Sequence, residues 1–181
     1  MAIAEEKARL RSEMRAKLRA MPEKERAEQS ARISDWLIQQ LPVGATVLSF
    51  AALKTEPNLD LLIEADLRLV FPRVVGDGQL DLWRVVDLDR DLAVGAFGIR
   101  EPLETQCQLA QLTEIEAILV PGVAFCAADG ARLGQGGGFY DRILSETEVS
   151  KLGVCFRQQL LDQIPTEEHD ARVDQIALWS G

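Results

Sequence analysis

Residues 117–142 read AILVPGVAFCAADGARLGQGGGFYDR, and they combine a short apolar strand, a glycine-rich loop and the start of a helix. Four glycines occupy the five positions 134–138. Because glycine has no side chain, its backbone N–H groups approach a ligand closely. A helix that begins directly after such a loop adds the positive end of its dipole. The stretch therefore predicts a phosphate cradle at the end of a strand, and we expect the chain to bind a nucleotide.

The loop differs from both standard nucleotide motifs. The Walker A pattern GxxxxGK[ST] is absent, and Phe139 stands where the dinucleotide fingerprint needs its third glycine. A surface turn that only requires positive φ is the alternative for the glycines alone. Arg132 before the loop and Asp141 after it favour ligand binding, since a carboxylate beside phosphate is a typical magnesium ligand.

Outward from this stretch, apolar segments alternate with helical patterns. Strands are predicted at 46–53, 67–72, 80–85, 117–121, 151–156 and 173–179, and helices at 3–21, 23–41, 58–65 and 139–147. Residues 95–102 are predicted to be a turn-rich connection. Alternating strands and helices are typical of an α/β fold, with a mostly parallel sheet flanked by helices on both faces. We therefore expect one domain over residues 1–181, with a Rossmann-like three-layer arrangement.

Composition limits the class of protein. The chain has 181 residues, of which 47% are hydrophobic, and no apolar run approaches the length of a membrane span. The N-terminus lacks the apolar core of a secretory signal. A net charge of −9 disfavours nucleic-acid binding. Cys107, Cys126 and Cys155 are odd in number and lack CxxC spacing, so we expect buried free thiols in a reducing cytoplasm. Nothing in the pattern requires a dimer, and a monomer is expected.

The first predicted helix carries a basic stripe at a stride of four residues, made by Lys7, Arg11, Arg15 and Arg19. Leu10, Met14 and Leu18 form a parallel apolar stripe. One interpretation is a solvated face with ion pairs to Glu6 and Glu13. The other is that the stripe closes on a triphosphate beside the glycine loop, and the pattern alone leaves both open. In the second helix, an apolar stripe is expected from Ala27, Ile33, Trp36, Leu37 and Leu41.

Other candidate residues have two interpretations each. Glu56 follows the first strand, so it is expected at the edge of the sheet where ligands bind, although a loop glutamate is commonly just solvated. Asp174 either shares a cation with Asp141 or is a polar residue at the entry to a strand. His169 is favoured as an exposed loop residue over a general base. Phe139 and Tyr140 either anchor the new helix in the core or flank a planar ligand.

Several segments, in order along the chain, resemble the 5-formyltetrahydrofolate cyclo-ligase (5,10-methenyltetrahydrofolate synthetase) family. Residues 7–21, KARLRSEMRAKLRAM, resemble its opening KxxLR helix, and residues 98–102, GIREP, resemble its central GIxEP segment. Residues 119–142 resemble its most diagnostic stretch, and residues 167–176, EEHDARVDQI, resemble its closing HDxxxD region. The joint match is specific because these blocks span nearly the whole chain.

The resemblance implies an enzyme that uses ATP as co-substrate and Mg²⁺ as cofactor to convert a reduced folate, 5-formyltetrahydrofolate, into 5,10-methenyltetrahydrofolate, with release of ADP and phosphate. In the family's mechanism the formyl oxygen is phosphorylated, N10 attacks the activated carbon, and phosphate leaves. Such chemistry requires alignment of the γ-phosphate and dispersal of its charge.

By the same resemblance, each site residue has an expected role. Lys7 and Arg11 match contacts to the ATP phosphates, Glu56 matches the glutamate near the formylated nitrogen, and Asp141 and Asp174 match the magnesium carboxylates. The nucleotide loop matches Arg132, Leu133, Gly134, Gln135, Gly136, Gly137, Gly138, Phe139 and Tyr140, and its part from Gln135 to Phe139 also borders the folate. No catalytic base is assigned, and His169 stays without a role.

The chain departs from the family pattern at Glu56-Pro57-Asn58-Leu59, where Glu-Val-Asp-Thr is common. The loop between Phe125 and Arg132 is one residue longer, with Cys126 in place of a common aspartate, and Phe139 replaces a common tyrosine. The altered Glu56 segment supports an alternative function, an ATP-dependent enzyme of the same fold with another formylated or amide-like substrate. A non-catalytic folate- or nucleotide-binding module is the third hypothesis.

Overall fold

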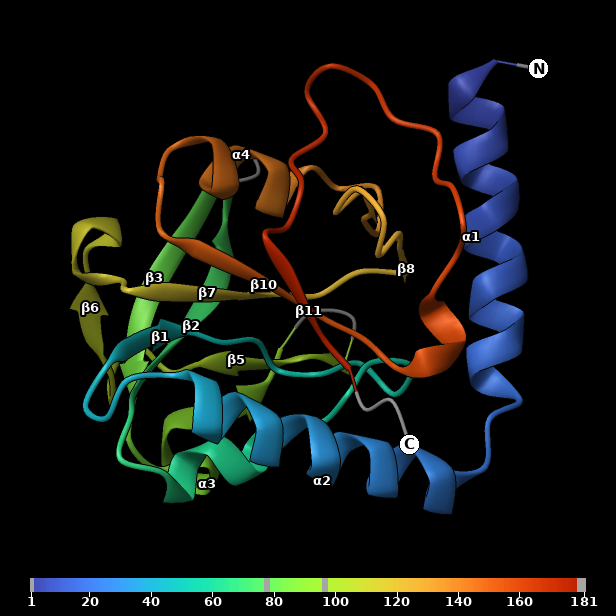
Figure 1. The fold of residues 1–181 in the computed structure, drawn as a ribbon. Helices are drawn as coiled ribbons and strands as arrows, with labels where there is room; N and C mark the ends of the chain where they lie inside the picture. Colours follow the sequence, from blue (N-terminus) through green and yellow to red (C-terminus); the bar gives the residue numbers. More distant parts are fainter. Residues whose placement is uncertain (1, 77–78, 96–97, 179–181) are drawn as a thin grey trace.

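The computed structural model describes residues 2–76, 79–95 and 98–178, and Figure 1 shows their arrangement. Its centre is a seven-stranded sheet with the strand order β11-β10-β7-β1-β2-β3-β6. These strands span Thr46–Leu48 (β1), Arg68–Val75 (β2), Gln79–Val85 (β3), Gln108–Ala110 (β6), Ala117–Val120 (β7), Ser150–Val154 (β10) and Gln175–Ala177 (β11). The helices span Ile3–Arg19 (α1), Glu23–Gln40 (α2), Leu88–Asp91 (α3) and Phe139–Ser145 (α4), with 3₁₀ helices at Asp60–Glu64 (η1), Leu112–Glu114 (η4) and Arg157–Gln159 (η5).

The sheet confirms the predicted α/β class. The four pairs from β11 to β2 are parallel, whereas β2–β3 and β3–β6 are antiparallel. In Figure 1, α2 and α3 lie on one side of the sheet and α4 lies on the other, which gives the three layers. α1 stands at the side of the molecule, next to the segment that links β10 to β11. Among the described residues, no helix is long and apolar enough to span a membrane.

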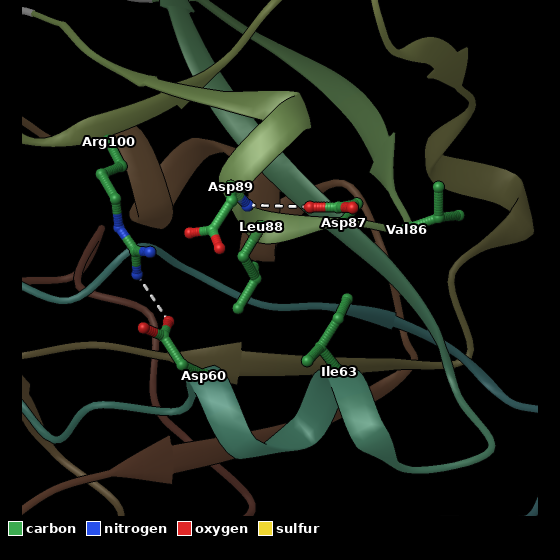
Figure 2. A pocket seen from close by; sticks show the side chains of 7 residues that line it. All are labelled: Asp60, Ile63, Val86, Asp87, Leu88, Asp89 and Arg100. Atoms are coloured by element: carbon green, nitrogen blue, oxygen red, sulfur yellow. Dashed lines mark hydrogen bonds and ion pairs between the residues drawn. The ribbon is translucent and has the colours of Figure 1, made fainter.

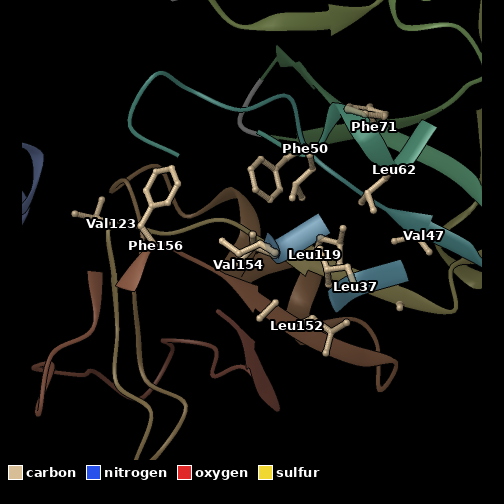
Figure 3. Packing of buried hydrophobic residues seen from close by; sticks show 14 of the residues in the cluster. Leu37, Val47, Phe50, Leu62, Phe71, Leu119, Val123, Leu152, Val154 and Phe156 are labelled. Atoms are coloured by element: carbon tan, nitrogen blue, oxygen red, sulfur yellow. The ribbon is translucent and has the colours of Figure 1, made fainter. Parts of the chain in front are cut away.

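Alternate residues of the central strands enter two separate hydrophobic clusters. Val47, Leu119 and Val154 belong to the cluster that α2 and η1 cover, which Figure 3 shows from close by. Their neighbours Leu48 and Ile118 belong to the cluster under α4. Successive side chains of a strand point to opposite faces, so a sheet covered on both faces requires continuous apolar runs. This requirement explains why AILV at 117–120 is buried throughout.

The apolar stripe predicted on α2 is wrong at one position. Ala27 is exposed, whereas Gln29, Ser30 and Ser34 are buried with Ile33 and Leu37. Two of these polar groups have partners in neighbouring loops: the Gln29 amide oxygen accepts from the backbone N–H of residue 157, and Ser30 Oγ accepts from that of Asn58, both at 3.0 Å. The Ser34 hydroxyl has no partner among the described residues. A buried polar side chain is tolerated when it is hydrogen-bonded in this way.

Several short elements differ from the sequence prediction. Within residues 58–65, Asp60–Glu64 form the 3₁₀ helix η1 instead of an α-helix, and the first strand ends at Leu48 instead of residue 53. Two hairpins were not predicted, one from Leu92–Val94 (β4) and Arg100–Pro102 (β5), the other from Ala124–Phe125 (β8) and Arg132–Leu133 (β9). Strands of two or three residues are too short to show any periodicity. Residues 96–97 of the predicted connection and residue 179 of the last predicted strand lie outside the described residues.

The position of the site follows from the sheet order. β1 and β7 are parallel neighbours, but the chain continues from β1 to β2 on one side and from β7 to β10 on the other. At such a switch point the two loops diverge beyond the carboxyl ends of the strands, which leaves room for a ligand between them. The loop after β1 contains Glu56, and the glycine loop follows β7 and the β8–β9 hairpin.

Candidate active site

The glycine loop, residues 134–138, connects β9 to α4 and needs each of its glycines. Gly136 and Gly138 have φ angles of 106° and 68°, which side chains rarely adopt. A Cβ at Gly134 would lie 2.9 Å from the Arg132 guanidinium, and one at Gly137 would lie 2.5 Å from the ring two residues later. Positive φ therefore explains two glycines, and close packing explains the other two.

Two arginines of α1 hold this loop. The Arg11 Nε donates to the carbonyl oxygen of Gly134 at 2.8 Å, and Arg15 donates to both the carbonyl and the side chain of Gln135. Both arginines are partly exposed. All their acceptors are uncharged, so the two guanidinium groups keep their full positive charge beside the loop.

Lys7 has a different environment. Its side chain is only 6% exposed, and its ammonium lies 2.5 Å from Asp170 Oδ2 and 2.8 Å from Glu167 Oε2. Burial lowers the pKa of Lys7, but the two carboxylates outweigh burial, and the net pKa lies above its usual value. One of the two interpretations of the basic stripe required ion pairs with Glu6 and Glu13. Among the described residues the stripe makes neither pair, and Glu13 pairs instead with Arg9.

Arg132 and Asp141 bind each other. Arg132 Nη2 donates to Asp141 Oδ1 at 2.6 Å, and Arg132 Nη1 donates to the carbonyl oxygen of Pro121 at 3.2 Å. The backbone N–H of Ala171 also donates to Asp141 Oδ1. The side chain of Arg132 is 4% exposed, and its guanidinium lies over the ring of Tyr140. The ion pair thus fixes the arginine beneath the glycine loop.

These groups surround one cavity of about 970 Å³ between α1, the glycine loop and residues 167–174. Of the residues predicted to bind ATP or metal, the cavity is lined by Lys7, Arg11, Arg132, Leu133, Gly134, Gly136, Gly137, Gly138, Asp141 and Asp174. Among the described residues, the lining does not include Gln135, Phe139, Tyr140 or Glu56. The volume is at the upper end of the range typical of small-molecule sites, which is large enough for a nucleotide.

Glu56 lies behind the loop, where Gln135 contacts it. Glu56 is 7% exposed, and its Oε1 accepts from Gln135 Nε2 at 3.1 Å while its Oε2 accepts from the backbone N–H of Leu53 at 3.0 Å. Burial raises the pKa of Glu56, and the two donors oppose this rise without cancelling it. The altered residue Asn58 has a local role, because its Oδ1 accepts from the backbone N–H of Asp60 at the start of η1.

The remaining candidates have distinct environments. His169 is 75% exposed, as the sequence favoured. The Tyr140 hydroxyl is buried and has no hydrogen-bond partner among the described residues, and burial together with the charge of Glu56 raises its pKa well above the usual value. Cys107, Cys126 and Cys155 are free, and the latter two are buried.

A second hollow, of about 390 Å³, lies apart from the glycine loop and is shown in Figure 2. It is lined by residues of η1 and α3 together with Arg100. Most of its charged groups already have partners, because Arg100 pairs with Asp60 at 2.5 Å and Asp87 caps the first turn of α3. The 970 Å³ cavity is therefore the better candidate for a functional site.

The sheet order and the cavity at its switch point, with the glycine loop, Lys7 and Arg11 in its wall, define an α/β protein with a candidate ligand site. Comparison with known proteins identifies the family. The model of the 5-formyltetrahydrofolate cyclo-ligase family matches residues 3–178. This chain belongs to that family.

Individual relatives agree with this assignment. The chain is 31% identical over 179 residues to the 5-formyltetrahydrofolate cyclo-ligase of Mycolicibacterium smegmatis, covering 94% of this chain and 92% of the relative. It is 27% identical over 184 residues to the mouse enzyme of the same name. The structure of Aquifex aeolicus 5,10-methenyltetrahydrofolate synthetase superposes with a TM-score of 0.79 at 32% identity, over 94% of this chain and 88% of that one. A Mycoplasma pneumoniae synthetase, at 23% identity and a TM-score of 0.76, shares the fold.

Sequence reasoning missed three contributors to the site. Glu167 and Asp170 bind Lys7, and only the HDxxxD block pointed to that segment. Arg15 was predicted only as a member of the basic stripe, and its contact with Gln135 was not foreseen. Contacts of this kind join residues more than a hundred positions apart, so no local pattern indicates them.

Proposed function

We propose that this protein is a single-domain enzyme that converts 5-formyltetrahydrofolate into 5,10-methenyltetrahydrofolate and consumes ATP, with ADP and phosphate as products. The observation that carries the proposal is the family match over residues 3–178 together with a cavity lined by the glycine loop and by Lys7 and Arg11. A monomeric state, a cytoplasmic location and the absence of nucleic-acid and membrane partners stay predictions from composition and charge.

ATP occupies the 970 Å³ cavity in this proposal. Arg11 and the backbone of residues 134–138 contact its phosphates, and Lys7 adds a second cation that Glu167 and Asp170 hold in place. Arg132 supports the loop from below through its pair with Asp141. A guanidinium fixed before the reaction disperses the charge of the γ-phosphate without having to reorganise in the transition state.

The reduced folate binds on the Glu56 side of the loop, next to Gln135 and Phe139. The formyl oxygen of the folate attacks the γ-phosphorus, and ADP leaves. N10 then attacks the activated formyl carbon, loses its proton and expels phosphate. The phosphorylation is needed because an amide oxygen is a poor leaving group. The chain's task is to keep the two substrates aligned across the glycine loop.

The pocket suits the magnesium ion that the family implies. Asp141 and Asp174 both line the cavity, and each has one carboxylate oxygen that accepts no hydrogen bond from the described residues. Magnesium prefers such carboxylate oxygens together with water and phosphate oxygens. When bound, the ion would neutralise phosphate charge. The carboxylates of Glu167 and Asp170 also line the cavity, and both are already paired with the single ammonium of Lys7.

A spectrophotometric assay tests the proposal. Purified protein with 5-formyltetrahydrofolate, ATP and Mg²⁺ should produce the near-ultraviolet absorbance of the methenyl product, and omission of ATP or addition of EDTA should abolish it. The Asp141→Asn variant should lose roughly a hundredfold or more in turnover, and because it also removes the counter-ion of the buried Arg132, circular dichroism must show that the variant is folded. Folded wild-type protein that produces no methenyl product would contradict the proposal. ATP binding without folate turnover would instead favour another formylated or amide-like substrate.

A further inference from the structure

The glycine loop and the buried carboxylate of Glu56 are joined by one side chain, that of Gln135. Its Nε2 donates to Glu56 Oε1 at 3.1 Å, and the other carboxylate oxygen accepts from the backbone N–H of Leu53 at 3.0 Å. Half of the hydrogen bonding that the described residues supply to this buried carboxylate therefore comes from the nucleotide loop.

Arg15 determines which way the Gln135 amide points. Arg15 Nη2 donates to Gln135 Oε1 at 2.8 Å and to the Gln135 carbonyl oxygen at 3.2 Å. A guanidinium only donates and a carboxylate only accepts, so the amide oxygen must face Arg15 and its nitrogen must face Glu56. A flipped amide would place two donors together and two acceptors together. The two hydrogen bonds of the Gln135 side chain therefore have one favourable arrangement, in which Arg15 donates to Gln135 and Gln135 donates to Glu56.

Gln135 lies between two residues that line the cavity, although it does not line the cavity itself. Gly134 and Gly136 line the cavity, whereas the side chain of Gln135 turns to Glu56. Arg11 holds the Gly134 carbonyl at 2.8 Å, so α1 grips two successive residues of the loop. A ligand that orders the loop backbone at positions 134 and 136 consequently orders the amide that contacts Glu56.

We propose that Gln135, oriented by Arg15, is a positioning residue that couples the two substrate subsites, so that nucleotide in the cavity raises the affinity for the reduced folate at Glu56. The inference rests on the proposed function, since it takes ATP and the folate as the two ligands. Each ligand benefits from the same ordered loop, and the entropy lost in ordering it is lost once for both. Because coupling between binding sites is reciprocal, the folate raises nucleotide affinity by the same factor.

The charge of Glu56 gives an independent signature. Gln135 and the Leu53 N–H stabilise the charged carboxylate against burial, and the charge of Glu56 in turn raises the pKa of Tyr140. Loss of the Gln135 amide therefore raises the pKa of Glu56 further. Glu56 then becomes neutral at a higher pH, so folate affinity should begin to fall at a higher pH as the solution is acidified.

The test compares wild type with Gln135→Met, which keeps the length of the side chain and removes the amide. The dissociation constant of 5-formyltetrahydrofolate is measured by calorimetry with and without a saturating non-hydrolysable ATP analogue and Mg²⁺. We expect roughly a fivefold or greater coupling in wild type, a typical size for linked sites, and a factor close to one in Gln135→Met. Arg15→Met should give an intermediate factor, and Arg9→Met on the same helix should match wild type, because Arg9 pairs only with Glu13 among the described residues.

Two further measurements separate a positioning role from a structural one. In the first, the pH below which folate affinity falls should be higher in Gln135→Met than in wild type. In the second, the ATP analogue alone should protect the Leu53 amide from hydrogen exchange in wild type but not in the variant. Equal coupling, equal pH dependence of folate affinity and equal protection in wild type and Gln135→Met would overturn the inference while wild-type turnover left the proposed function intact. Wild type that neither binds nor converts the folate would overturn the proposed function and this inference with it.

Discussion

Lys7 and Arg11 lie one turn apart on the same face of α1, yet their charges have different uses. Lys7 is buried, and its ammonium is held by the carboxylates of Glu167 and Asp170. Arg11 donates to a neutral carbonyl oxygen of the glycine loop and keeps its net charge. The basic stripe therefore has two parts: Lys7 lines the cavity and also fastens α1 to the C-terminal segment, whereas Arg11 lines the cavity without a carboxylate partner among the described residues. Equal spacing along a helix does not imply equal roles.

The largest expected effect is on stability, and it should come from removing the ion pairs of Lys7 with Glu167 and Asp170. Lys7→Met leaves Glu167 and Asp170 without their counter-ion, and we expect a loss of about 3 kcal/mol in the free energy of unfolding, at the low end for a buried pair because Glu167 is partly exposed. Urea unfolding followed by circular dichroism measures it. Adding Glu167→Gln and Asp170→Asn should restore most of the loss. An unchanged unfolding midpoint in Lys7→Met would contradict the fastening role.

Arg11→Ala should have the opposite profile. Stability should change little, because the side chain is partly exposed and its acceptor carbonyl becomes accessible to water. The KM for ATP should rise roughly ten- to a hundredfold, since a hydrogen bond to a charged group contributes about 1.5–3 kcal/mol. Turnover measured against ATP concentration checks this, and Arg11→Lys should recover part of the affinity. If Arg11→Ala instead lost much stability while its KM for ATP stayed unchanged, Arg11 would be a structural residue and its assigned role in ATP binding would be wrong.

The pH dependence of stability sharpens the comparison. Burial raises the pKa of Asp170, whereas Lys7 and a backbone N–H lower it. The lowering effects are together larger than the effect of burial, so the net pKa lies below the usual 3.8. The contribution of Asp170 is therefore complete above about pH 4 and is lost as pH falls through its folded pKa. Lys7 has a raised pKa, so its contribution to the free energy of unfolding is complete below about pH 10. That contribution is lost as the pH rises through the folded-state pKa of Lys7.

The difference in unfolding free energy between wild type and Lys7→Met should accordingly be constant between about pH 5 and pH 9. It should shrink on the acid side as Asp170 is protonated, which urea titrations at several pH values would measure. Arg11→Ala should show no such dependence. A difference that grows as the pH falls below 4 would rule out the Lys7–Asp170 pair as its source.

The smallest effect is expected for Arg9→Ala, a matched removal of positive charge from α1. Arg9 and Glu13 are 49% and 58% exposed, so their pair should contribute less than about 0.5 kcal/mol. The KM for ATP should stay within twofold of wild type, since Arg9 does not line the cavity among the described residues. A marked rise in KM would mean that the overall charge of α1 matters more than the position of Arg11.

The sequence predicted the layers of this fold because a sheet buried on both faces needs apolar runs such as AILV at 117–120. It missed the β8–β9 hairpin, whose strands have two residues each, although this hairpin places Arg132 beneath the loop. The glycine loop and Glu56 were predicted to lie at one edge of the sheet, and the Gln135 contact brings them together. The partners of Lys7 were sought within the helix, where a side chain reaches only three or four residues along.

The distance in sequence between those partners has a consequence for folding. Lys7 and Asp170 are 163 positions apart, and Arg11 and Gly134 are 123 apart. Loop closure becomes more unfavourable with length, and contacts between remote residues form slowly. The sheet must first bring the two ends of the chain together before α1 can dock. We expect the wall of the cavity to be the last part of the native state to assemble, and nucleotide to accelerate refolding only in its final phase.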